Sequence, residues 1–192
     1  KRAAEINFRN LHTIKAIHPM RLLSGMLCLI LLISIRPLRA QLQVTPSTGM
    51  SPDALVKNVL IGQGVTVSNV KFNNSTNNIS VAAIGTFQNG STTNLGINGG
   101  IILTSGAATI AVGPNNSNSA GQSNNLPGDP QLALLIPGYT VNDASILEFD
   151  FVPESDTIEF RWVFGSDEYP EFVNTSFNDV FGFFLTGIEP VT

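Results

Sequence analysis

The chain has 192 residues, of which 43% are hydrophobic and 12% are charged, so it is long and apolar enough for one domain with a core. From Gln41 onward, three basic residues (Lys57, Lys71 and Arg161) stand against thirteen acidic ones, which gives a net charge of −10. Such a surface repels nucleic-acid phosphates and anionic lipid headgroups, so we exclude both as partners.

The first forty residues differ from the rest, because they carry seven of the ten basic residues and a single acidic one. Residues 1–19 precede the first methionine, Met20, and we interpret them as a segment upstream of the true start. Residues 20–40 have the pattern of a secretory signal peptide, with Arg21, an apolar run over 22–35 and the small residue Ala40. The run is shorter than the ~20 residues of a membrane-spanning helix, which makes a membrane anchor the weaker alternative. Cleavage near Ala40 predicts a secreted or cell-surface protein.

The single cysteine, Cys28, lies inside this leader, so the predicted mature chain has none. That is unlike a small secreted domain held by disulfides, and it fits a bacterial export route better. Stability must then come from a larger core or a bound metal. We expect residues 41–50 to be a linker and 51–192 to form the domain.

A short helix is predicted at the start of this domain, over 51–62. Ser51 can cap it, Pro52 suits its first position, and Gly62 ends it. Four apolar side chains share one face of the helix: Leu55, Val56, Val59 and Leu60. A second short helix is predicted to start at Asp129-Pro130 and to end before Pro137-Gly138, with Leu132, Leu135 and Ile136 available for packing.

Alternating apolar residues predict strands between and after these helices. The first covers 65–72, a polar patch at 73–78 follows, and strand-like runs resume at 79–87 and 95–106. Residues 113–129 hold almost no side chain suited to a core and are expected to form a surface loop.

Two further alternating runs, 147–151 and 158–164, predict an antiparallel hairpin with one buried face. The second run has an apolar face of Ile158, Phe160, Trp162 and Phe164, and a solvent-facing side with Glu159 and Arg161. The apolar run over 180–185 predicts a strand buried on both sides. Many short strands and two short helices predict an all-β fold, an antiparallel β-sandwich, without a fixed-period repeat.

The segment FRWVFGSDEYPEFVNTSFNDVFGFFLTG, residues 160–187, resembles the signature of the choice-of-anchor L domain, a module of bacterial surface and secreted proteins that is frequent in Bacteroidota. The resemblance extends through LVKNVLIGQGVTVSNVKF, IGTFQNGSTTNLGINGGIILTSG and LEFDFVP. It implies export, a cell-surface or extracellular role, and further adhesive modules with a sorting signal beyond residue 192. Similar domains continue with more strands, so the resemblance also implies that this β domain is incomplete at Thr192. It implies no known reaction.

Acidic residues crowd this segment without a basic residue between 165 and 184, which is costly unless water or a cation screens them. Calcium is held by carboxylate and amide oxygens, although no EF-hand spacing is present. The candidate calcium ligands are Asp167, Glu168, Glu171, Asn178 and Asp179, and Asn174 supplies a further amide. In the alternative, Asp167 and Asp179 cap turns while Glu168 and Glu171 face solvent.

Aromatic residues in the same segment could provide a platform for sugar rings, because aromatic faces suit apolar ring surfaces. The candidates are Tyr169, Phe172 and Phe177. Phenylalanines at alternating spacing more often belong to a core, so Tyr169, which precedes Pro170, is the better candidate ligand-binding residue.

Catalysis is limited by the residues present. Both histidines, His12 and His18, precede Met20, so the predicted mature chain lacks His and Cys. This excludes Ser-His-Asp and Cys-His mechanisms, and it excludes zinc bound through nitrogen and sulfur.

The sequence therefore predicts a non-catalytic extracellular or cell-surface binding or adhesion module of a larger exported bacterial protein, with a glycan or protein as its partner. The alternative is a domain that binds or hydrolyses glycans through the carboxylates of Glu168, Glu171 and Asp179.

Overall fold

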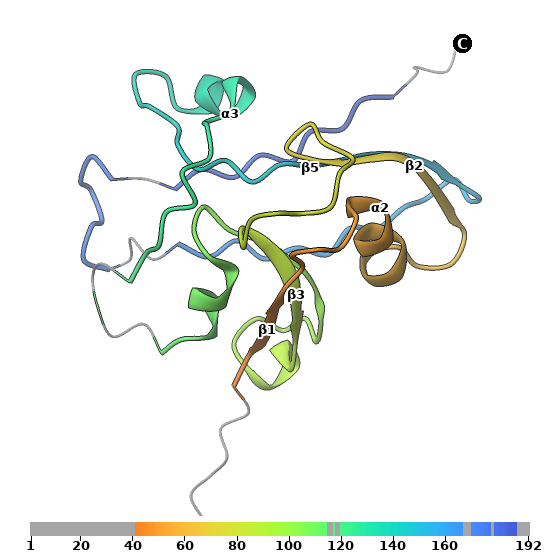
Figure 1. Ribbon diagram of the computed structural model, residues 1–192, viewed down its shortest axis with the longest axis horizontal. Helices are drawn as coiled ribbons and strands as arrows, with labels where there is room; N and C mark the ends of the chain where they lie inside the picture. The colour runs from red at the N-terminus through yellow and green to blue at the C-terminus, as the bar shows by residue number, and fades with distance from the viewer. Residues whose placement is uncertain (1–40, 115–116, 118–119, 167–169, 178, 188–192) are drawn as a thin grey trace, which may run out of the picture. The chain divides into compact units, whose positions relative to one another are not determined.

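The computed structural model describes residues 41–187 except 115–116, 118–119, 167–169 and 178 (Figure 1). The leader predicted over 1–40 lies outside this described part. No helix in the described ranges is long and apolar enough to cross a membrane.

Two antiparallel sheets make up the architecture. One sheet has three strands in the order β1 (Gln43–Pro46), β3 (Ile84–Gln88) and β4 (Gly100–Leu103). The other pairs β2 (Val65–Phe72) with β5 (Leu147–Pro153). The expected linker at 41–50 thus contains β1, which pairs with β3 from Gln43↔Gln88 to Pro46↔Gly85.

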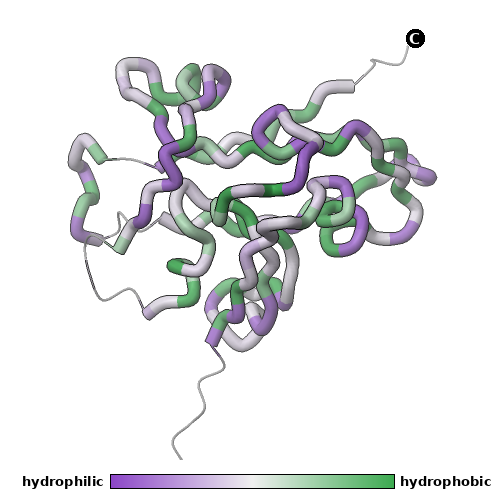
Figure 2. The backbone as a smooth tube through the Cα atoms, in the orientation of Figure 1, coloured by the Kyte–Doolittle hydropathy of each residue, from purple (hydrophilic) through white to green (hydrophobic). Residues whose placement is uncertain are grey.

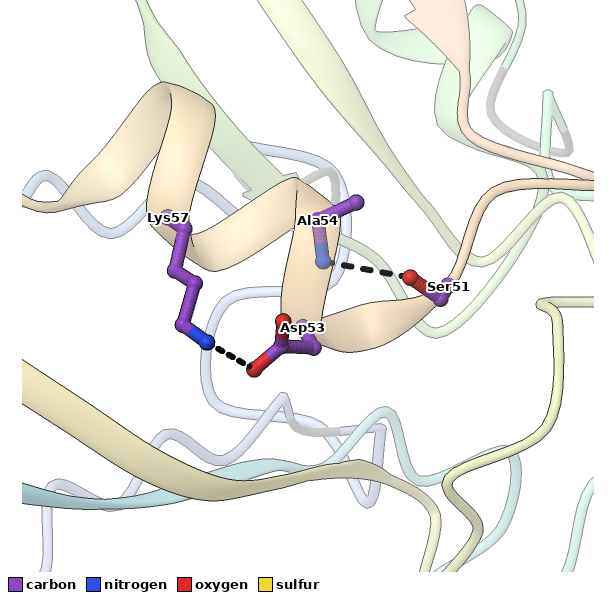
Figure 3. A network of polar contacts seen from close by, with 4 residues as sticks. All are labelled: Ser51, Asp53, Ala54 and Lys57. Atoms are coloured by element: carbon purple, nitrogen blue, oxygen red, sulfur yellow. Dashed lines mark hydrogen bonds and ion pairs between the residues drawn. The ribbon is translucent and has the colours of Figure 1, made fainter.

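The first predicted helix is present but changes its winding. It runs as α2 (Pro52–Leu55) and continues as a π-helical turn, η1 (Val56–Leu60). The hydroxyl of Ser51 accepts a hydrogen bond from the Ala54 N–H at 3.2 Å (Figure 3). Leu55 and Val56 are completely buried, whereas Leu60 is 39% exposed. The expected packing of Leu60 is wrong, because the wider i→i+5 turn rotates it off the buried face.

Strand β2 shows how an irregular sequence pattern buries one continuous face. Its buried residues Val67, Val70 and Phe72 do not follow strict alternation. The pairing register with β5 shifts between Ser68 and Lys71, and Asn69 has a left-handed φ of 53°. A β-bulge there adds one residue and returns the following side chains to the same face.

The predicted hairpin between 147–151 and 158–164 is wrong. β5 pairs with β2 instead, with Val67 opposite Phe151 and Phe72 opposite Leu147. Residues 157–166 form no regular strand. Alternation indicates which face of a strand is apolar, but it does not choose the neighbouring strand.

Residues 180–185 also differ from the prediction of a strand buried on both sides, because no strand forms there. Four of these side chains are exposed by 41–61%: Phe181, Phe183, Phe184 and Leu185. A continuous apolar run favours a buried segment, but the segment is buried only where another layer of the protein packs against it.

The core lies between the two sheets. One cluster joins Leu55 and Phe72 to Ile84 of β3, and a second joins Val56 to buried valines of β2. Ile101 from β4 and Leu147 from β5 pack against both clusters. Hydrophobic and hydrophilic residues alternate along β5 (Figure 2). The predicted all-β antiparallel class is confirmed, and the sheets share one core, as in a sandwich.

The long loop and the second helix form where the sequence places them. In the described part of 113–129 there is no helix or strand, apart from an isolated bridge between Gly106 and Ser123. Helix α3 (Pro130–Leu135) follows, and the Asp129 carboxylate caps it by accepting the Leu132 N–H at 2.9 Å. The helix has no fully buried residue, and Leu135 is 50% exposed rather than packed.

Candidate functional site

The acidic segment after Gly165 is only partly described. Four of its predicted site residues, Asp167, Glu168, Tyr169 and Asn178, lie outside the described residues. Glu171 is exposed to solvent. Asp179 is half-buried and accepts a hydrogen bond from the Ser166 hydroxyl at 2.7 Å. This bond joins the two ends of the acidic segment.

Residues 170–177 form a turn that is held by its own hydrogen bonds. The Phe172 carbonyl accepts bonds from the Thr175 N–H at 3.0 Å and from the Thr175 hydroxyl at 2.7 Å. The same hydroxyl accepts the Phe177 N–H at 3.2 Å. Asn174 has a left-handed φ of 63°, which asparagine tolerates better than most residues. The rings of Phe172 and Phe177 meet edge to face at 5.3 Å, so they pack on each other.

Metal coordination was predicted for five residues of this segment, and the described part contains only Glu171 and Asp179. Among the residues that the structure describes, no group of three or more acidic, histidine or cysteine side chains is placed to hold a metal ion. The exposed residue Glu171 nevertheless supplies carboxylate oxygens of the kind that calcium prefers.

An exposed aromatic array is the main feature that sequence reasoning missed. It consists of Trp162, Phe164 and Phe181, which are 59%, 48% and 41% exposed. Trp162 stacks on Phe181 with ring centroids 4.9 Å apart and an interplanar angle of 27°. Phe164 lies on Phe181 at 5.9 Å and 29°. The alternation of residues 158–164 predicted a buried face here, and that prediction is wrong for Trp162 and Phe164.

A second row of rings connects this region to the sheet. Phe160 contacts Phe151 of β5 at 5.9 Å and Phe183 at 5.1 Å. Phe151 in turn packs against the buried valines of β2. The segments 158–164 and 180–185 are therefore held to the core by side chains, although no backbone ladder joins them to β5.

Comparison with known proteins shows which family the chain belongs to. No curated protein and no solved structure matches it. The family model described as "Choice-of-anchor L domain" matches residues 43–192, which include both sheets, the acidic segment and the aromatic array. The chain therefore belongs to the choice-of-anchor L domain family, a family of cell-surface or secreted proteins.

Proposed function

We propose that this domain is a non-catalytic binding or adhesion module of an exported protein, and that the aromatic array contacts its ligand. The observation that carries the proposal is the exposure of Trp162, Phe164 and Phe181 as one stacked group. Contiguous exposed apolar groups mark interaction sites in soluble proteins, and aromatic residues dominate the energetics of such contacts. A ligand that covers the array would remove its apolar surface from water.

The inventory of reactive side chains supports binding over catalysis. From residue 41 onward the chain has no His and no Cys, which leaves carboxylates as its main acid–base groups. Of the three carboxylates considered for glycan hydrolysis, Glu171 is exposed and Asp179 bonds to Ser166.

The aromatic array gives a direct test. A double change of Phe164→Ser and Phe181→Ser in the full chain is expected to lower binding at least tenfold on an array of glycans and extracellular proteins. Leu134→Ser is the matched control, because Leu134 is a large apolar side chain that is 81% exposed on α3, outside the aromatic array. Unchanged binding by a folded double variant, or release of reducing sugar from a retained glycan, would contradict the proposal.

Calcium is the second part of the proposal, and it rests on the donor chemistry of the acidic segment. If the ion orders this segment, calcium at a hundred times its Kd stabilises the domain by about 2.7 kcal/mol. For a domain of this size, that raises the thermal midpoint by roughly 5–10 °C. The effect should be lost in chelator and in the Glu171→Gln, Asp179→Asn double variant, whereas Glu154→Gln should retain it. Identical midpoints in calcium and in chelator would remove the ion from the proposal.

A further inference from the structure

A cleft beside the aromatic array combines an arginine with the single tryptophan of the chain. It is shallow and open, and it lies between the turn at 95–97 and the segment 160–163, with a volume of about 420 Å³. We propose that this cleft binds an acidic saccharide, with Arg161 pairing to the sugar carboxylate and Trp162 stacking on the sugar ring. The inference rests on the proposed binding function and names the ligand class.

Trp162 is held as a platform before any ligand arrives. Phe181 stacks on its ring at 4.9 Å, and Phe164 supports Phe181 in the same way at 5.9 Å. Trp162 still exposes 59% of its surface, so much of the indole is available to a ligand. A sugar ring has an apolar C–H face that matches an aromatic face, and the support from Phe181 reduces the ordering cost on binding.

Arg161 is the basic residue that lies beside the exposed tryptophan, where it is available to an anionic ligand. Lys57 forms an ion pair with Asp53 at 2.9 Å, and Lys71 lies opposite Glu148 in the β2–β5 register. Arg161 is exposed and forms no ion pair with any carboxylate in the described ranges. A guanidinium binds a carboxylate through two parallel hydrogen bonds, which fixes orientation as well as charge.

The facing wall of the cleft is a loop fixed by hydrogen bonds. The Gly90 N–H donates to the Asn98 carbonyl at 2.9 Å, which closes the loop. Inside it, the Thr93 hydroxyl donates to the Gly90 carbonyl at 2.8 Å and accepts the Leu95 N–H at 3.2 Å. Leu95 and Ile97 of this loop line the cleft together with Trp162. The cleft thus offers apolar side chains next to the Arg161 guanidinium.

The charge of the domain narrows the ligand class. With a net charge of −10 from residue 41 onward, the surface repels a dense polyanion such as a phosphate backbone. A saccharide with isolated carboxylates places one charge at Arg161 and keeps its hydroxyls in water. An acidic peptide shares the carboxylate but lacks the rigid apolar ring face that suits Trp162.

The test uses the fluorescence of the single tryptophan, which lies in the proposed site. Digalacturonic acid is titrated into the full chain in parallel with its dimethyl ester and with tetraglutamate. The acid is expected to change Trp162 emission and to bind about five- to tenfold more tightly than the ester. This ratio is expected because only the acid forms a charge-assisted pair with Arg161, and solvent partly screens that pair. Tetraglutamate should bind more weakly than the acid.

Arg161→Gln should bring the acid-to-ester affinity ratio to about one, whereas Lys57→Gln removes the same charge elsewhere and should preserve the ratio. The comparison on the unmodified chain stands by itself if Arg161→Gln does not fold. The inference is overturned if digalacturonic acid does not bind, or if it binds no more tightly than its dimethyl ester or than tetraglutamate. It is also overturned if calorimetry detects binding of the acid while Trp162 emission stays unchanged. Each of these results leaves the proposed function intact if the aromatic array still retains another ligand.

Discussion

Leu55→Ala is expected to lower the free energy of unfolding by about 2–5 kcal/mol, the range for removing a large aliphatic side chain from a packed core. Leu55 is completely buried and packs with Phe72 of β2 and Ile84 of β3, so it joins the two sheets. Its loss leaves a cavity where the α2 segment and both sheets meet. Urea denaturation at equilibrium measures the change as a lower midpoint with an unaltered slope.

Leu60→Ala is the matched control for this experiment, since it makes the same chemical change five residues along the chain. Leu60 is 39% exposed after the π-helical turn, so it contributes less burial. We expect its cost to be well below that of Leu55→Ala. Equal losses for the two variants would mean that α2 and η1 do not pack as described.

Gly90→Ala is expected to cost about 1–3 kcal/mol of unfolding free energy, because a methyl group there has no room. The added Cβ would overlap the carbonyl oxygen of Ile97 and approach the Phe87 ring to 3.1 Å. Backbone cannot move aside as a flexible side chain can, so the loop must open. Since this loop forms one wall of the cleft at Arg161, affinity for digalacturonic acid should fall with stability.

Gly62→Ala serves as the control for the glycine change. A Cβ at Gly62 meets nothing within 4 Å, and the backbone there does not have a left-handed φ. The substitution should be neutral or stabilise the domain by up to about 0.4–1 kcal/mol, because alanine restricts the unfolded chain. Thermal unfolding of both variants separates a steric effect from a general effect of losing glycine. Equal unfolding midpoints for Gly90→Ala and Gly62→Ala would contradict the described loop.

The two proposals depend on one feature, which is the apolar surface that Trp162, Phe164 and Phe181 expose as a stacked group. Phe160 attaches this region to the core through Phe151, yet Trp162 and Phe181 remain exposed. Side chains that stack on one another keep a defined surface without burial, and that is the property a binding platform needs.

Some features were predictable because they depend on neighbours in sequence. Ser51 and Asp129 cap their helices as predicted, since a capping side chain reaches an N–H three residues away. The strand at 65–72 and the all-β class followed from apolar periodicity.

Other features depended on contacts that sequence spacing cannot specify. Asn73 belongs to a patch predicted only to interrupt the strands, yet it binds a distant segment. Its side chain donates to the Ala144 carbonyl at 3.2 Å and accepts the Ile146 N–H at 2.8 Å. An asparagine can make the same bonds to any backbone nearby, so its partner is set by the fold.

The amino-acid sequence by itself determined the helix caps, the strand at 65–72 and the class of fold, because capping bonds and apolar periodicity depend on residues that are close together in the chain. Its motifs also indicated the family. Only the tertiary structure decided that β5 pairs with β2 and that Trp162 stays exposed beside Arg161. Strand partners compete through long-range contacts, and an apolar side chain is buried only where another layer covers it.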